Sequence, residues 1–170
     1  DMAQAQFNAA DNMTDRIAAL MTLANGDAPQ RAGAIAAFYD RYRDNPLVID
    51  KWFSVQAMSA REDTLDAVRA LYDHPDFTLA NPNRVRALAG AFAMNQRHFH
   101  AKDGAGYRFL ADVLLALDPI NPQTAAKLLP PLGRWKRFDA DRQALMRGSL
   151  ERILAASNLS KDVFEQASKS

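Results

Sequence analysis

Cysteine is absent from all 170 residues of the sequence. Its absence excludes disulfide frameworks, cysteine-containing zinc sites, iron–sulfur clusters and cysteine nucleophiles. Glycine and proline are sparse, with 7 and 8 residues, too few for a loop-rich or low-complexity chain. No apolar run approaches the roughly 20 residues that cross a bilayer, and the polar start shows no signal peptide. These absences leave a globular domain with an ordinary core and no membrane partner.

Charge of one sign is not in excess either. Lys plus Arg number 21 and Asp plus Glu number 20, so the net charge is +1. This balance argues against a protein whose main task is to bind nucleic acid or anionic membrane. The basic segment at residues 134–137 is more simply explained by one or two arginines that bind a carboxylate or line a polar channel. Because the chain starts with Asp1 and not Met, we expect it to be part of a longer protein.

Motifs for catalysis or metal binding are missing. The histidines, His74, His98 and His100, form no HExxH word, which the helical zinc-protease site requires. A metal at His98 and His100 would need Asp103 as third ligand. The simpler interpretation is a loop between helices with one imidazole bonded to backbone. No GxSxG or GxGxxG pattern occurs, so the residues alone predict a non-catalytic chain without a metal site.

Helical signals run along the whole chain and predict an all-α fold. Alanine, leucine, arginine and glutamine are common, and these residues favour helices. The acid pairs Glu62–Asp63 and Asp139/Asp141 are expected to cap helices, since carboxylates stabilise the positive end of the helix dipole. Pro130 and Pro131 should break a helix. About nine helices are predicted, near residues 8–23, 27–42, 45–59, 62–72, 83–95, 103–117, 121–129 with a continuation to 135, 139–156, and after 160.

The dipeptide Asn-Pro recurs at residues 45–46, 81–82 and 121–122, with spacings of 36 and 40 residues. Asn is a good N-cap and Pro suits the first helical position, so each pair should start a helical hairpin. A period of about 38 residues lies in the range of HEAT and armadillo repeats. We therefore predict an α-solenoid of stacked hairpins, a HEAT- or armadillo-like superhelix; an irregular helical bundle with chance spacing is the alternative.

Several short sequence motifs resemble those of a known family. They are VIDKWF at 48–53, NPNRVR at 81–86, FHAKDGAGY at 99–107 and LGRWKRFD at 132–139. They occur in the order and spacing of the C-terminal helical domain of bacterial aminopeptidase N, of the M1 zinc metallopeptidase family. The chain resembles that domain from about residue 35 to about residue 165.

The resemblance implies that residues 1–170 form a single helical-repeat domain, the C-terminal part of a longer zinc aminopeptidase. In the family, the zinc and the catalytic residues lie in an upstream domain, so this fragment itself is expected to hold no cofactor and no catalytic residue. The implied partners are that catalytic domain of the same polypeptide and peptide substrates, in the cytoplasm. The helical domain is expected to pack over the catalytic domain, close a chamber and admit only short peptides.

The resemblance also points to individual residues. Arg86 and Lys127 match positions where basic side chains project into the chamber, and are expected to attract the C-terminal part of the peptide. An ordinary helix-surface ion pair is the alternative for both. Asn81, Asn83 and Arg84 are expected to form a capping and loop-ordering motif. At the level of function, the alternative is a free-standing helical-repeat adaptor that grips a protein or peptide on its concave face.

Overall fold

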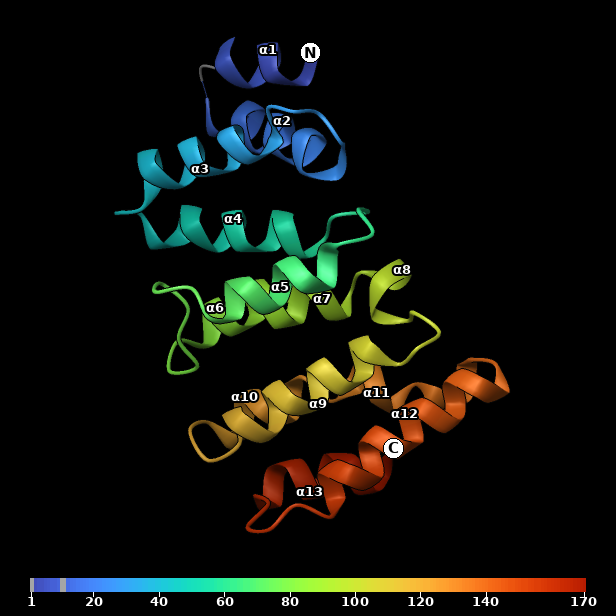
Figure 1. Ribbon diagram of the computed structural model, residues 1–170. Helices are drawn as coiled ribbons and strands as arrows, with labels where there is room; N and C mark the ends of the chain where they lie inside the picture. The colour runs from blue at the N-terminus through green and yellow to red at the C-terminus, as the bar shows by residue number, and fades with distance from the viewer. Residues whose placement is uncertain (1, 10–11) are drawn as a thin grey trace.

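The computed structural model describes residues 2–9 and 12–170, and within these ranges every regular element is a helix (Figure 1). The helices stack along one direction from the N-terminus to the C-terminus, so each packs on helices of its own hairpin or of a nearby one. The prediction of an all-α stack of hairpins is confirmed. The longer helices are α2 (Met13–Asn25), α3 (Arg31–Tyr42), α4 (Pro46–Ala57), α5 (Thr64–Tyr72), α9 (Ala105–Leu117), α12 (Ala140–Leu154) and α13 (Lys161–Lys169).

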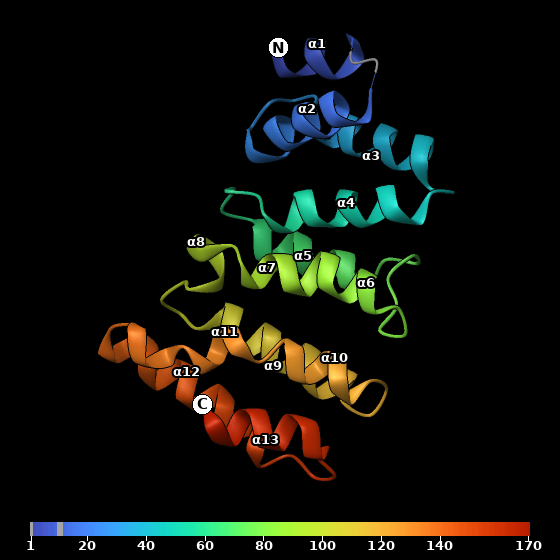
Figure 2. The ribbon, with the colours of Figure 1, turned by 180° about the vertical axis from the view of Figure 1, so that it is seen from behind.

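All three Asn-Pro pairs start a helix, as predicted. The side chains of Asn45, Asn81 and Asn121 each accept a hydrogen bond from the amide three residues later, at 3.4, 3.2 and 3.1 Å. The prolines that follow open α4, α6 (Pro82–Val85) and α10 (Pro122–Lys127). These three helix starts lie along the same edge of the stack in both views (Figures 1 and 2), so the sequence period is a period in space.

Helix boundaries differ from the prediction in several places. The helix expected from residue 8 to 23 is replaced by α1 (Met2–Ala9) and α2, with residues 10 and 11 outside the described residues. The helix expected at 83–95 consists of α6, a π-helical segment η1 (Arg86–Gly90) and α7 (Ala91–Ala93). The loop expected at 96–102 contains a helical turn, α8 (Gln96–Phe99).

The break at the two prolines is confirmed. Helix α10 ends at Lys127, and Pro130 opens the short α11 (Pro130–Gly133), followed by the 3-10 turn η2 (Trp135–Arg137). The cap expected from Asp103 takes a different form. Its carboxylate accepts from the Ala105 amide at 3.0 Å, while Gly104, at φ 73°, is the residue that enters α9.

Large aromatic and aliphatic side chains fill the space between successive helices. Phe38, Phe53, Phe92 and Tyr107 are fully buried. The entry to α9 is tight: a Cβ atom on Gly106 would lie 2.4 Å from the carbonyl oxygen of the preceding α8 turn. Because real Cβ atoms do not approach backbone so closely, glycine is required here.

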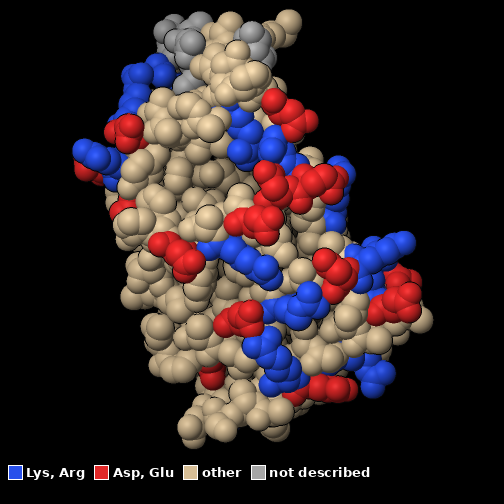
Figure 3. Space-filling view, viewed as in Figure 1, with Lys and Arg blue, Asp and Glu red and all other residues tan. Residues whose placement is uncertain are grey.

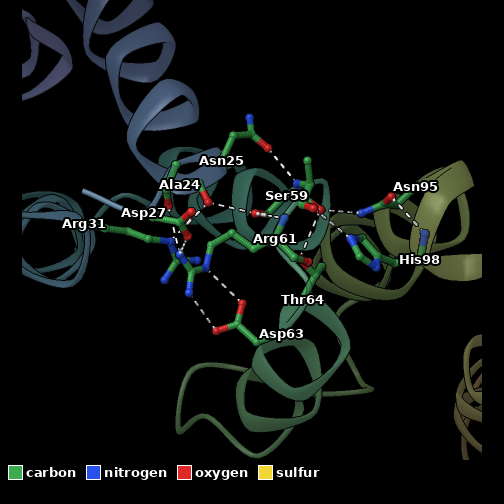
Figure 4. Close-up of polar contacts among 12 residues, drawn as sticks. Ala24, Asn25, Asp27, Arg31, Ser59, Arg61, Asp63, Thr64, Asn95 and His98 are labelled. Atoms are coloured by element: carbon green, nitrogen blue, oxygen red, sulfur yellow. Dashed lines mark hydrogen bonds and ion pairs between the residues drawn. The ribbon is translucent and has the colours of Figure 1, made fainter. Parts of the chain in front are cut away.

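The turn between α4 and α5 is bonded to the repeat before it (Figure 4). The Ser59 hydroxyl donates to the Ala24 carbonyl at 2.7 Å. Arg61 donates to the Gly26 carbonyl at 3.0 Å and pairs with Asp63 at 2.9 Å. The expectation that Asp63 caps α5 is therefore wrong: no side-chain cap bond forms, and hydrogen bonds from Arg61 hold the pKa of Asp63 below its ordinary value.

The same turn is bonded to the repeat after it. The side-chain amide of Asn95 donates to the Ala57 and Ser59 carbonyls at 3.0 and 2.9 Å. The Nε2 atom of His98 lies 3.1 Å from the Ala60 carbonyl oxygen. Figure 4 shows these groups converging on one short segment of chain. We call the bonds made by Ser59, Arg61, Asn95 and His98 the edge network. It holds the α4–α5 turn to the end of α2 on one side and to the turn after α7 on the other, and so fixes three successive repeats against one another.

Candidate functional site

A groove of about 610 Å³ lies between η1–α7 and α10–α11. These helices face the viewer in Figure 2. This volume is in the range of ligand-binding clefts. Three cationic side chains line it, those of Arg86, Lys127 and Arg134, and all three residues are exposed. None of the described residues that line it is Asp or Glu. We call it the basic groove.

The structure thus brings together the two residues singled out for substrate attraction. Arg86 and Lys127 are 41 positions apart in sequence but line the same groove. The Arg86 guanidinium donates to the Asn83 side chain, in place of the ion pair considered from the sequence. Sequence reasoning missed Arg134 as a third member. The sequence does show a compact basic segment at 134–137, but it does not show that this segment lies beside Arg86 and Lys127.

The π-helical segment η1 shapes one wall of the groove. The Ala91 amide donates to the Arg86 carbonyl five residues earlier, and so passes over the carbonyl of Ala87. The Ser54 hydroxyl on α4 donates to that Ala87 carbonyl at 2.8 Å. A contact from the neighbouring repeat therefore stabilises the wide turn on which Arg86 sits, and π segments of this kind are frequent at functional sites.

The rest of the lining is mainly apolar. Met94 is 69% exposed at the end of α7, and Ala91, Pro130 and Pro131 also line the groove. The basic groove therefore combines three cations with an apolar wall. That combination suits a ligand that carries both a negative group and an apolar part.

The residues of the capping motif at 81–84 do not line the basic groove. They order the loop that precedes α6. Arg84 is only 6% exposed. Its Nε lies 2.6 Å from Asp50, its Nη1 donates to the Asp76 carbonyl, and its guanidinium lies 5.1 Å from the centre of the Phe53 ring. Arg84 is thus a buried anchor that holds the start of α6, two residues before Arg86.

Other recesses in the described chain lack a uniform charge. The recess between α5 and α9 is lined by Arg69, Asp73 and Asp112. A recess beside the basic groove shares Lys127 with it but contains Asp162 and Glu165. On the face of Figure 3, positive and negative side chains alternate across the surface. An anionic ligand is therefore favoured most at the basic groove.

The histidines are used in packing. His100 Nδ1 lies 2.7 Å from the hydroxyl of the buried Tyr107. Burial raises the pKa of Tyr107 to about 12, so the phenol keeps its proton. Burial, with the nearby Arg142, lowers the pKa of His100. Among the described residues, no group of three or more His, Asp or Glu is placed to hold a metal ion.

Comparison with known proteins places this architecture in a family. A family model described as "Domain of unknown function (DUF3458_C) ARM repeats" matches residues 1–170. The chain belongs to this ARM-repeat family. Aminopeptidase N of Caulobacter vibrioides is 49% identical over 164 residues, and aminopeptidase N of Escherichia coli is 46% identical over 165. Each match covers 96% of this chain and 19% of the relative.

A solved structure agrees with these relatives. The crystal structure of Legionella pneumophila aminopeptidase A in complex with aspartic acid superposes with a TM-score of 0.94 at 36% identity. The match covers 99% of this chain and 20% of that one. This ARM-repeat domain thus spans about a fifth of the proteins it matches and corresponds to a C-terminal portion of the aminopeptidase N chains. The resemblance seen in the sequence words is confirmed. No helix of the described chain is long and apolar enough to cross a membrane.

Proposed function

We propose that this chain is the non-catalytic helical-repeat domain of a cytoplasmic zinc aminopeptidase, which removes N-terminal residues from peptides. In this proposal the domain packs over the catalytic domain of the same polypeptide and closes the chamber, so that short peptides enter. The zinc would be held outside this chain, because the described residues provide no ligand set for it. The roles assigned to this chain are therefore attraction and placement of the peptide.

The observation that carries the proposal is the basic groove, taken with the relatives' names. Proteins called aminopeptidase N contain a segment of similar length that is 46–49% identical to this chain. A peptide processed from its N-terminus presents a carboxylate at its other end. Arg86, Lys127 and Arg134 line one groove without an acidic neighbour in it. The electrostatic potential in the groove is therefore positive and complements the charge of that carboxylate. Such fields raise association rates and set orientation more than they raise affinity.

The first test is the coding sequence on the N-terminal side of Asp1. The proposal predicts an in-frame HExxH word with a glutamate on a following helix. A start codon close to Asp1 without these motifs would overturn it and favour the adaptor alternative.

The second test uses that full-length enzyme with two substrates. One is a short peptide with a free C-terminus, and the other is an aminoacyl p-nitroanilide, which has no carboxylate. The double variant Arg86→Gln, Lys127→Gln should raise KM for the peptide about three- to ten-fold, the effect of two exposed ion pairs, and leave the p-nitroanilide unchanged. Arg43→Gln, which removes a charge outside the groove, is the matched control. Equal effects on both substrates would contradict a role in holding the carboxylate.

A further inference from the structure

The apolar part of the basic groove lies on both of its walls, beside the cations. Seven large apolar residues are exposed in the described chain, and of these only Met94 lines the basic groove. Single exposed apolar residues are ordinary. Met94, however, continues into the apolar surface of Ala91, Pro130 and Pro131 in the same groove.

The backbone that carries Met94 is firmly held. Its neighbours Ala93 and Asn95 are 5% and 7% exposed, and the Asn95 side chain donates two bonds of the edge network to carbonyls at the α4–α5 turn. The Met94 amide itself closes α7 by donating to the Ala91 carbonyl at 3.1 Å. A flexible, polarisable side chain is thus presented to the groove from a fixed point. Methionine at such positions accommodates varied apolar partners.

The space between Arg86 and Met94 is kept open by small residues. Gly90 and Ala91 lie between them on the same wall, and a Cβ atom on Gly90 would contact only the Cβ of Arg86, at 3.7 Å. On the facing wall, Pro130 and Pro131 stand in sequence between Lys127 and Arg134 and line the same groove, so apolar surface lies beside two of the three cations.

We propose that the basic groove selects peptides whose C-terminal residue has an apolar side chain. The carboxylate lies among Arg86, Lys127 and Arg134, and the side chain packs on Met94 and the Pro130–Pro131 step. This inference rests on the proposed function and adds the substrate class: short peptides that end in a residue such as leucine.

The test is a titration of this chain, followed by NMR, with four probes. They are alanyl-alanyl-alanyl-leucine and alanyl-alanyl-alanyl-asparagine, each as free acid and as C-terminal amide. Leucine and asparagine are similar in size, so they differ mainly in polarity. The leucine acid should bind about five-fold more tightly than the asparagine acid, the effect expected for partial burial of one apolar side chain.

Two variants and one control locate the effect. Met94→Gln should abolish the preference for leucine, while Met21→Gln, an exposed methionine on α2, should leave it intact. Gly90→Leu should lower the affinity for the leucine acid at least five-fold, because the added side chain fills the groove. Its Cβ meets only an ordinary contact, and an unchanged circular dichroism spectrum checks that it folds.

The outcomes separate the two proposals. Equal binding of acid and amide would overturn the proposed carboxylate attraction, and this inference with it. Acids that bind more tightly than amides, but with leucine and asparagine alike, would overturn only this inference. A leucine preference that survives Met94→Gln, or an affinity for the leucine acid that Gly90→Leu leaves unchanged, would also overturn it, because the apolar contact would then lie elsewhere.

Discussion

Replacing Arg84 by methionine is expected to destabilise the fold by about 3 kcal/mol. The Arg84 side chain is 8% exposed and lies 2.6 Å from Asp50, whose side chain is 17% exposed. Methionine fills similar volume over the Phe53 ring, but it leaves the Asp50 carboxylate and the Asp76 carbonyl without their donor. Removing one partner of a buried pair costs about 3–5 kcal/mol. Because Asp50 retains some contact with water, we expect the lower end of that range.

Urea denaturation measures this loss directly. With a slope of about 2 kcal/mol per molar urea, the midpoint should fall by about 1.5 M. The double variant with Asp50→Asn should recover part of the loss, with a coupling of about 1–3 kcal/mol. Arg97→Gln is the control, since Arg97 and Glu62 pair at 62% and 81% exposure and such pairs contribute under about 1 kcal/mol. A midpoint for Arg84→Met within about 0.5 M of wild type, or strict additivity with Asp50→Asn, would refute the anchoring role.

Three further predictions concern other parts of the fold. Asn95→Ala should lower the free energy of unfolding by about 2–3 kcal/mol, because two carbonyls of the edge network lose their donor; an unchanged melting temperature would contradict this. Gly106→Ala should cost about 3 kcal/mol or more through its backbone clash, whereas Gly148→Ala on α12, with nothing within 4 Å of its Cβ, should stabilise the fold by about 0.5–1 kcal/mol. The lowered pKa of His100 stabilises the fold above pH about 6.5, and this contribution is lost as the pH falls through the folded-state pKa. His100→Gln, which keeps a hydrogen-bond partner for Tyr107, should therefore flatten the decline of the urea midpoint in that range, and an equally steep decline would count against it.

Features set by local chemistry were predictable from the sequence. The caps of Asn45, Asn81 and Asn121 need only a side chain and an amide three residues away, so the hairpin period and the all-α class followed from the printed residues. The break at Pro130 also depends on a local property of the chain.

Features set by tertiary contact were not predictable. In the π segment at Arg86–Gly90, the Ala87 carbonyl accepts a hydrogen bond from a hydroxyl on α4, 33 residues away. No local sequence pattern predicts this contact. Asp63 had the position of a cap, but Arg61 lies within reach of it in the folded turn. Arg134 joins the basic groove only because the fold places the end of α11 across the groove from η1 and α7, so sequence reasoning found two of the three cations.

The measurement that tests the central claim most directly is the affinity of this chain for one short peptide as free acid and as amide, at low and moderate salt. We predict that the acid binds more tightly, that the difference shrinks as salt rises, and that Arg86→Gln reduces it while Arg43→Gln does not. Equal affinities for acid and amide, or a difference that Arg86→Gln leaves unchanged, would contradict the account of the basic groove.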